Sequence, residues 1–295
     1  MMTKDLLYGG IEAGGTKFIC AVSDADLNII DQVRIDTTVP EETMGELKTF
    51  FDQYDLASFG IASFGPIDVN HDSATYGYIT STPKLSWQNY DFVGQMQTWF
   101  VDKPIAWTTD VNGASLAENT MGAAEGAKSC LYLTIGTGVG GGFSMNGEIY
   151  HAYSHPEMGH IKVAQDPHDH FEGACPFHGN CIEGLVSGPA IEKRTGIKGA
   201  DLPADHEVWD YVANYLGQAI ANYTLTLAPE RVILGGGVMH QAQLLDKIRT
   251  QVAKAMANYV ELPAMTDYIQ LPKLGDDAGI TGALLLAKQA LASAE

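Results

Sequence analysis

The chain has 295 residues, of which 45% are hydrophobic, and a formal net charge of −19. Charge of this sign argues against a nucleic-acid-binding surface, which needs clustered Lys and Arg. No stretch approaches the ~20 apolar residues of a membrane span. The N-terminus lacks the apolar region of a secretory signal, so we expect a cytoplasmic globular protein of one or two domains. An anionic substrate would then need local help from backbone amides or a metal ion.

Hydrophobic patterns predict an α/β order in the first half of the chain. The predicted strands are 7–13, 17–23, 29–36, 59–62 and 105–108, and the predicted helices are 43–54, 92–100 and 110–121. The second half repeats this order loosely. It has a hairpin at 131–150, an irregular loop to about 185, a strand at 231–234, and helices within 187–196, 205–227, 240–258 and 279–292.

This duplication predicts two lobes with a boundary near residue 120. The N-terminal lobe would span 1–120. The C-terminal lobe would span 121–295, with the C-terminal helix a candidate for packing back on the first lobe.

Two glycine-rich turns are the most informative motifs. The first contains Gly14, Gly15, Thr16 and Lys17, and the second contains Gly136, Thr137 and Gly138. Glycine lets backbone N–H groups approach an anionic ligand closely, and threonine adds a hydroxyl donor. Each turn alone is equally well explained as a tight hairpin. Together, and with a third turn at Gly235, Gly236 and Gly237, they predict two lobes that bind one polyphosphate.

The second turn also matches the dinucleotide fingerprint G-x-G-x-x-G through Gly141. That fingerprint requires a helix after the glycines, whereas residues 143–150 read as strand, Asn-Gly turn and strand. The first turn is not a Walker A site, because Thr16 precedes Lys17 and a strand follows. A nicotinamide-dependent oxidoreductase is therefore disfavoured.

Asp110 lies where a predicted strand ends and a predicted helix begins, the place where ligand-binding groups gather in α/β sheets. From the sequence alone, two readings are equal: a functional carboxylate, or an N-cap of the helix that begins near Asn112.

Four residues in the irregular loop form a set that suits a metal. His160, Cys175, His178 and Cys181 supply two imidazoles and two thiols, which is a suitable tetrahedral set for Zn²⁺. A Cys175–Cys181 disulfide is disfavoured in a reducing compartment, and unligated surface residues are the simplest alternative. His168 and His170 lie close enough in sequence to replace one of the four. Cys20 and Cys130 read as small core residues.

These motifs resemble, in their order, the ROK family of sugar kinases, and the resemblance runs from residue 7 to 279–283. It rests on the two turns, on Thr109-Asp110-Val111-Asn112, on Glu157-Met158-Gly159-His160 and on Leu234-Gly235-Gly236-Gly237. The resemblance implies the actin-like, hexokinase-like (ribonuclease H-like) ATPase fold, with two lobes and a central cleft. Residues 175–181 resemble the zinc loop of bacterial fructokinases. In the first glycine loop the family commonly has Asp where this chain has Glu12, whose side chain is one methylene longer. The role of that Asp on the metal side of the site therefore does not carry over directly to Glu12.

The resemblance also implies roles for individual residues. Asp110 becomes the general base, typically worth ~10²–10⁴-fold in rate. The sugar hydroxyls would form hydrogen bonds with Glu157, His160 and Glu183. Asn112 would be a further polar contact, and Gly65 would lie in a loop near the cleft. Pro189, otherwise an ordinary helix start, would lie beside the nucleotide with Gly236 and Gly237. Lys84 reads as a solvated charge.

The resulting expectation is an ATP-dependent fructokinase that makes fructose 6-phosphate, with ATP, Mg²⁺ and a structural Zn²⁺. A homodimer is implied by the resemblance alone, and neither nucleic acid nor membrane is expected as a partner. A glucokinase or mannokinase on the same scaffold is the nearest alternative. A sugar-sensing relative is another, but the transcriptional repressors of the family carry a DNA-binding segment ahead of the first turn, where this chain has about six residues.

Overall fold

The computed structural model describes residues 6–150 and 152–294. Within these residues the chain divides into two compact units. Unit 1 contains 6–117, 148–155 (without 151) and 276–294, and unit 2 contains 118–147 and 156–275. The described residues of 148–155 group with unit 1, and the predicted boundary near 120 lies close to the first crossing, at 117–118. The chain therefore passes from one unit to the other four times, which no local sequence pattern signals.

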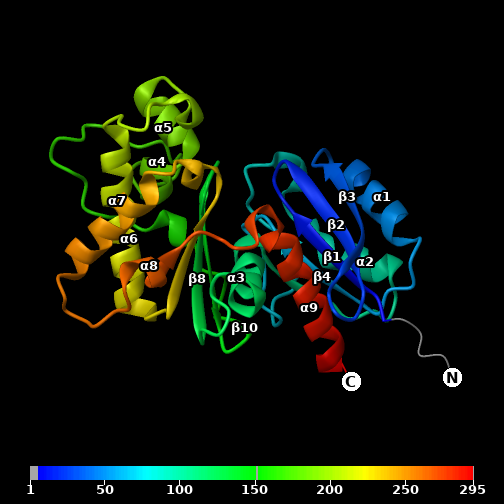
Figure 1. Ribbon diagram of the computed structural model, residues 1–295. Helices are drawn as coiled ribbons and strands as arrows, with labels where there is room; N and C mark the ends of the chain where they lie inside the picture. Colours follow the sequence, from blue (N-terminus) through cyan, green and yellow to red (C-terminus); the bar gives the residue numbers. More distant parts are fainter. Residues whose placement is uncertain (1–5, 151, 295) are drawn as a thin grey trace. The chain divides into compact units, whose positions relative to one another are not determined.

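Unit 1 is built on a sheet with strand order β3-β2-β1-β4-β7 (Figure 1). Strands β1 to β3 are antiparallel, and β4 and β7 are parallel to β1. The elements are β1 (Tyr8–Ala13), β2 (Lys17–Ser23), β3 (Ile29–Asp36), α1 (Pro40–Phe51), β4 (Ser58–Ser63), β5 (Tyr78–Ile79), η1 (Leu85–Trp87), β6 (Tyr90–Asp91), α2 (Phe92–Trp99), β7 (Ile105–Thr109), α3 (Asp110–Met121, whose last residues belong to unit 2), β10 (Glu148–Ile149) and α9 (Ala278–Ala294).

Alternating side chains place a core on each face of this sheet. Phe18 and Cys20 of β2 pack in one buried cluster with residues of α1 and α2, such as Leu47. Ile19 and Ala21 point the other way and pack with α9. Helix α9 therefore covers the second face of a sheet whose first strand is about 270 residues earlier, and Figure 1 shows it beside β1 and β4.

Unit 2 repeats the arrangement of a hairpin followed by parallel strands. Strands β8 and β9 are antiparallel, while β11 and β12 continue the sheet in parallel. The elements are β8 (Ser129–Ile135), β9 (Val139–Met145), η2 (Met158–His160), α4 (Ile182–Val186), α5 (Gly188–Thr195), η3 (Gly199–Asp201), α6 (Val208–Leu227), β11 (Arg231–Gly235), η4 (Gly237–His240), α7 (Leu244–Met256), α8 (Met265–Tyr268), β12 (Ile269–Gln270) and η5 (Gly275–Asp277, at the return to unit 1).

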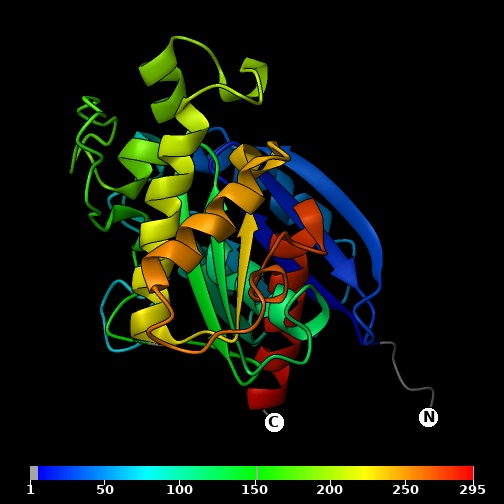
Figure 2. The same ribbon diagram turned by 60° about the vertical axis from the view of Figure 1, so that its left-hand side comes forward.

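The core of unit 2 lies between its sheet and its long helices. Helices α6 and α7 lie side by side (Figure 2), and residues of both, including Trp209 and Ile248, share one buried cluster with Leu131 and Val232 of the sheet. No helix in the described part of the chain is long and apolar enough to cross a membrane.

Candidate functional site

The second glycine turn joins β8 to β9, so no helix follows it, and the dinucleotide-fingerprint reading is excluded. The turn is closed by the Gly136 N–H, which donates to the Gly138 carbonyl at 2.9 Å. Thr137 at its tip is exposed. The turn therefore presents a hydroxyl and a glycine backbone to solvent.

Other predicted nucleotide residues of unit 2 gather around this turn. The Gly188 N–H, at the start of α5, donates to the Gly136 carbonyl at 2.8 Å, and Pro189 follows in the first turn of that helix. Gly236 has a positive φ of 89°, and a Cβ there would collide with the backbone of Ile135. Unit 2 thus brings two glycine turns and a helix N-terminus together, which is a combination suited to an anion.

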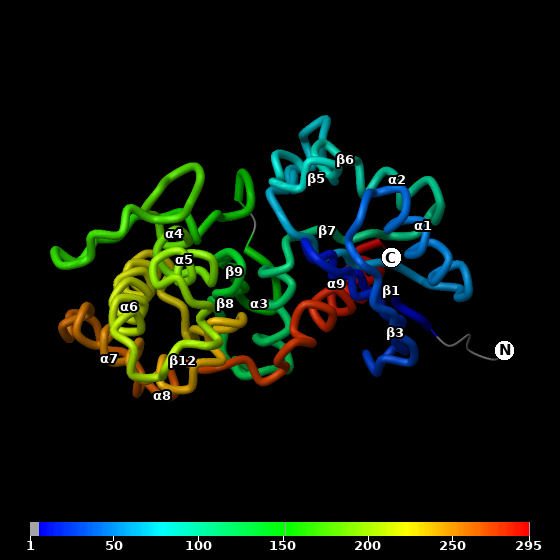
Figure 3. Tube along the Cα trace, turned by 90° about the horizontal axis from the view of Figure 1, so that it is seen from above, coloured from blue at the N-terminus to red at the C-terminus, as the bar shows by residue number. Residues whose placement is uncertain are grey.

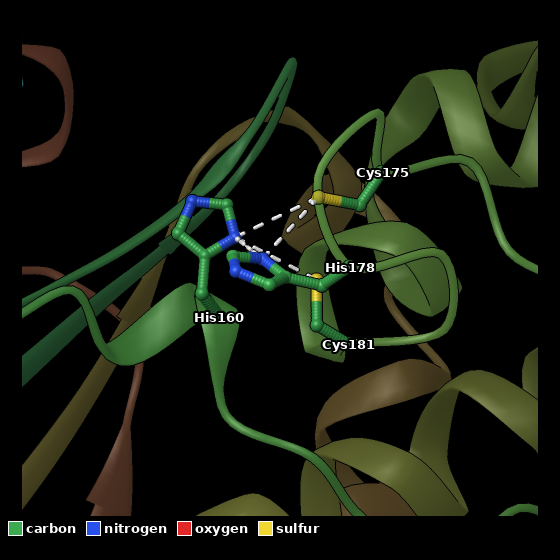
Figure 4. Close-up of side chains that lie close together, drawn as sticks. All are labelled: His160, Cys175, His178 and Cys181. Atoms are coloured by element: carbon green, nitrogen blue, oxygen red, sulfur yellow. Dashed lines mark hydrogen bonds between the residues drawn. The ribbon is translucent and has the colours of Figure 1, made fainter. Parts of the chain in front are cut away.

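The predicted metal ligands of unit 2 form one cluster (Figure 4). The ligand atoms of His160, Cys175, His178 and Cys181 all lie within 4.8 Å of one another. Both cysteines are free thiols, so the disulfide alternative is not present. His168 and His170 are exposed and are not in the cluster.

Short backbone contacts hold this cluster. Cys175 and Gly179 exchange N–H to carbonyl bonds of 3.2 and 3.0 Å, and a Cβ on Gly184 would collide with the Gly179 carbonyl. Burial raises the pKa of the Cys181 thiol to about 11, so at neutral pH the thiol keeps its proton unless a cation displaces it. The four side chains can hold a metal ion.

The predicted sugar residues of unit 2 have different surroundings. Glu157 is exposed, directly before η2, and His160 belongs to the metal cluster. The Glu183 carboxylate instead accepts a hydrogen bond from the Val139 N–H at 3.1 Å, at the end of the glycine turn. No local pattern signals this contact, because it joins residues 44 positions apart.

The first glycine turn lies in unit 1, between β1 and β2. The Gly14 N–H donates to the Lys17 carbonyl at 3.0 Å, and Thr16 and Lys17 are exposed. Lys84, which the sequence analysis treated as a solvated charge, is half-buried, and its Cε lies 3.2 Å from where a Cβ on Gly15 would be. The turn therefore has a second ammonium group beside it.

Asp110 is the first residue of α3, directly after β7. The Thr109 hydroxyl accepts the Asn112 N–H at 3.3 Å, as an N-cap does, and an Asp110 oxygen accepts the Val111 N–H at 2.8 Å. Asn112 is buried and its amide donates to Thr108, while its Oδ1 accepts no hydrogen bond from the residues that the structure describes. Thr109 thus supplies the cap that the alternative reading assigned to Asp110.

Glu12, on β1, is a carboxyl of unit 1 with a strongly raised pKa. Burial, and then the charge of Asp110, raise its pKa from 4.5 to about 7, whereas Lys17 acts in the opposite direction. A Cβ on Gly279 would collide with the Glu12 carboxyl, so the start of α9 closes over this side chain.

Gly65 lies in the loop after β4, which one histidine holds in place. His155 accepts the Ile67 N–H on its Nε2 at 3.1 Å. This contact fastens the segment 148–155 to the loop. His155 could not be predicted as a contact residue, because nothing near it in the sequence indicates a partner 88 residues away.

Known proteins share both the sequence and the fold. A fructokinase from Pediococcus pentosaceus is 44% identical over 289 residues, covering 98% of this chain and 100% of that protein. A fructokinase from Zymomonas mobilis is 45% identical over 296 residues, covering 97% and 98%. The crystal structure of a ROK hexokinase from Thermus thermophilus superposes with a TM-score of 0.78 at 24% identity, covering 98% of this chain and 100% of that one.

The structural likeness confirms the predicted actin-like ATPase fold. The model of the ROK family matches residues 8–290. That match spans nearly the whole chain, including both glycine turns, Asp110 and the four clustered metal-ligand residues. The chain therefore belongs to the ROK family.

Proposed function

We propose that this protein is an ATP-dependent fructokinase, which transfers the γ-phosphoryl group of ATP to the 6-hydroxyl of D-fructose. The observation that carries the proposal is its identity of 44–45% with the two fructokinases above, over nearly the full length of all three chains. Membership of a sugar kinase family supports the same reaction class.

The proposed chemistry needs few groups. A sugar hydroxyl must lose a proton as it attacks the γ-phosphoryl group, and the phosphate charge needs positioned donors and Mg²⁺. We assign the proton acceptor to Asp110 in unit 1. Its carboxylate is half-buried at the end of β7, and the cap of α3 is provided by Thr109 instead. Mg²⁺, when bound with ATP, would neutralise part of the phosphate charge. The protein as a whole cannot supply this positive charge, because its net charge is −19.

In unit 2 we assign the nucleotide to the turn at 136–138, to Pro189 and to the turn at 235–237. Gly188 at the N-terminus of α5 bonds to Gly136, so amide groups and the positive end of a helix meet at the turn. In unit 1 the corresponding residues are Gly14, Gly15, Thr16 and Lys17. Sugar hydroxyls are assigned to Asn112, Glu157, His160 and Glu183, with Gly65 in the loop after β4.

Zn²⁺ is the metal that fits the cluster best. Tetrahedral zinc with Zn–N of about 2.05 Å and Zn–S of about 2.3 Å requires about 3.3 Å between two nitrogens and about 3.6 Å between nitrogen and sulfur. The two Nδ1 atoms are 3.3 Å apart, and the Nδ1–Sγ distances are 3.6, 3.7 and 3.8 Å. Four protein ligands leave no open position, so the ion would be structural.

Removal of this metal tests the structural role. After dialysis against a chelator and return of Mg²⁺, we expect kcat/KM for fructose to fall at least about tenfold and the unfolding temperature to drop, because the loop loses its cross-link. Activity assays and thermal unfolding before and after zinc is restored measure both effects. Metal-free protein with full sugar affinity and turnover would rule out the role.

A panel of hexoses tests the substrate. With ATP in excess, we expect kcat/KM to be at least about tenfold higher for fructose than for glucose or mannose, since sites that bind hydroxyls discriminate strongly when a partner is missing. A coupled assay of ADP release gives the three values side by side. A preference for glucose or mannose would make the protein a different hexokinase of the same family, and no turnover of any sugar would favour a sugar-sensing role.

A cytoplasmic location stays a prediction from the sequence, and a homodimer stays a prediction of the family resemblance.

A further inference from the structure

The segment 181–188 contacts both ends of the glycine turn in unit 2. Near its start, Glu183 Oε2 accepts the Val139 N–H at 3.1 Å. At its end, the Gly188 N–H donates to the Gly136 carbonyl at 2.8 Å. The segment comprises the short helix α4 and the beginning of α5, which lie next to the β8–β9 hairpin (Figure 3).

At Gly138 and Gly159 a side chain would meet neighbouring atoms, which agrees with this arrangement. A Cβ on Gly138 would lie 2.8 Å from Glu183 Oε2, so the carboxylate packs directly against the turn. A side chain on Gly159 would collide with the Val139 carbonyl oxygen. The Val139 residue is therefore held on both sides, its N–H by Glu183 and its carbonyl against Gly159.

Each of the two residues that contact Val139 lies next to a proposed metal ligand in the sequence. Gly159 is followed directly by His160, and Glu183 stands two residues after Cys181. The His160 Nδ1 and Cys181 Sγ atoms are 3.6 Å apart. The metal loop and the glycine turn are thus one continuous structure within unit 2.

We infer that Glu183 is a positioning residue for the nucleotide: its carboxylate fixes the turn at 136–138 in the shape that receives the ATP phosphates, and the metal loop holds Glu183 in place. This inference rests on the proposed kinase function and extends it, because Glu183 was expected only to read the sugar. The Glu183 carboxylate would not bind the phosphates itself. It acts on the turn through the Val139 amide, whose N–H donates to its Oε2.

The test is nucleotide binding without sugar. Titration calorimetry with Mg²⁺ and a non-hydrolysable ATP analogue gives the affinity of the wild type and of three variants. We expect Glu183→Ala to bind at least about tenfold more weakly, because a hydrogen bond to a charged group is lost. Glu183→Gln should stay within about threefold of the wild type, because its amide oxygen still accepts the Val139 N–H. The control, Glu192→Ala, changes an exposed glutamate on α5 and should match the wild type.

Steady-state kinetics separate this role from sugar reading. If Glu183 positions the turn, Glu183→Ala raises the KM for ATP and Glu183→Gln restores it. If the alanine variant binds the analogue like the wild type and only the KM for fructose rises, the inference is overturned. Should the alanine variant fail to fold, Glu183→Asp decides, since its carboxylate is one methylene too short and should also weaken nucleotide binding.

The metal loop gives a second arm. Wild-type protein freed of zinc, with Mg²⁺ returned, should bind the analogue at least about tenfold more weakly without sugar. Unchanged affinity would overturn the part assigned to the metal loop. Intact wild-type protein that binds no nucleotide would instead overturn the proposed function, and the inference with it.

Discussion

Replacing Asp110 with Asn should lower kcat at least about 100-fold while changing the KM for fructose by less than about threefold. Asparagine keeps the size of the side chain, and its amide oxygen can still accept the Val111 N–H, which lies 2.8 Å from the carboxylate. It cannot take a proton from the sugar hydroxyl. The variant therefore removes the ability to accept the proton, together with the negative charge that acts on Glu12. Steady-state kinetics with fructose and ATP measure the result.

Stability distinguishes this loss from damage to the helix. The Thr109 hydroxyl, rather than Asp110, accepts the Asn112 N–H at the start of α3, so the unfolding free energy of Asp110→Asn should fall no more than about 0.5 kcal/mol below that of the wild type. Asp52→Asn is a matched control, because Asp52 is half exposed and its carboxylate pairs with Lys48 on α1. It should leave kcat unchanged. Near-normal turnover in Asp110→Asn would remove Asp110 from the mechanism.

The second large effect concerns Glu12, where Glu12→Gln should stabilise the protein at neutral and higher pH. In the folded chain its pKa is about 7 rather than 4.5, chiefly because the carboxyl is buried and secondly because Asp110 repels its charge. Since the folded state holds the proton more tightly, the stability that Glu12 contributes is present below pH 4.5 and is lost as the pH rises to about 7. The difference corresponds to about 3 kcal/mol, at about 1.4 kcal/mol for each pKa unit.

The measurement is the unfolding free energy in denaturant from pH 4 to pH 8, for both proteins. Tryptophan fluorescence follows unit 1 well, because Trp87, Trp99 and Trp107 lie in it. The advantage of Glu12→Gln should grow by about 3 kcal/mol across this range. Glu42→Gln, at an exposed position of α1, should give a curve parallel to that of the wild type. If the Glu12→Gln curve were parallel as well, Glu12 would titrate normally.

Much of the fold follows from local patterns. The glycines at 14–15 and 136–138, each between two apolar runs, predicted hairpins, and the structure has β1–β2 and β8–β9 there. The strand after Gly138 excluded a dinucleotide-binding helix correctly, because side-chain alternation in a strand is a short-range signal. The loop 175–181 predicted a chelating set for the same reason, since its three ligands are only three residues apart.

Contacts between distant segments could not be read in this way. Glu12 lies under Gly279, His155 holds Ile67, and Glu183 reaches Val139. A single sequence shows which residues can form such contacts, but not which of them meet. That depends on how helices pack on sheets and on where the chain crosses between units.

The sequence by itself thus determined the kind of element at each place, the glycine turns, the candidate base and the three candidate metal ligands of the loop 175–181, because each depends on residues within a turn or two of one another. Only the tertiary structure decided that His160, and neither His168 nor His170, lies with the three candidate metal ligands of the loop, that Thr109 rather than Asp110 caps α3, and that Glu183 bonds to the end of the glycine turn at 136–138. Each of these outcomes depends on the direction of a side chain in a packed fold, and packing is a property of the whole chain.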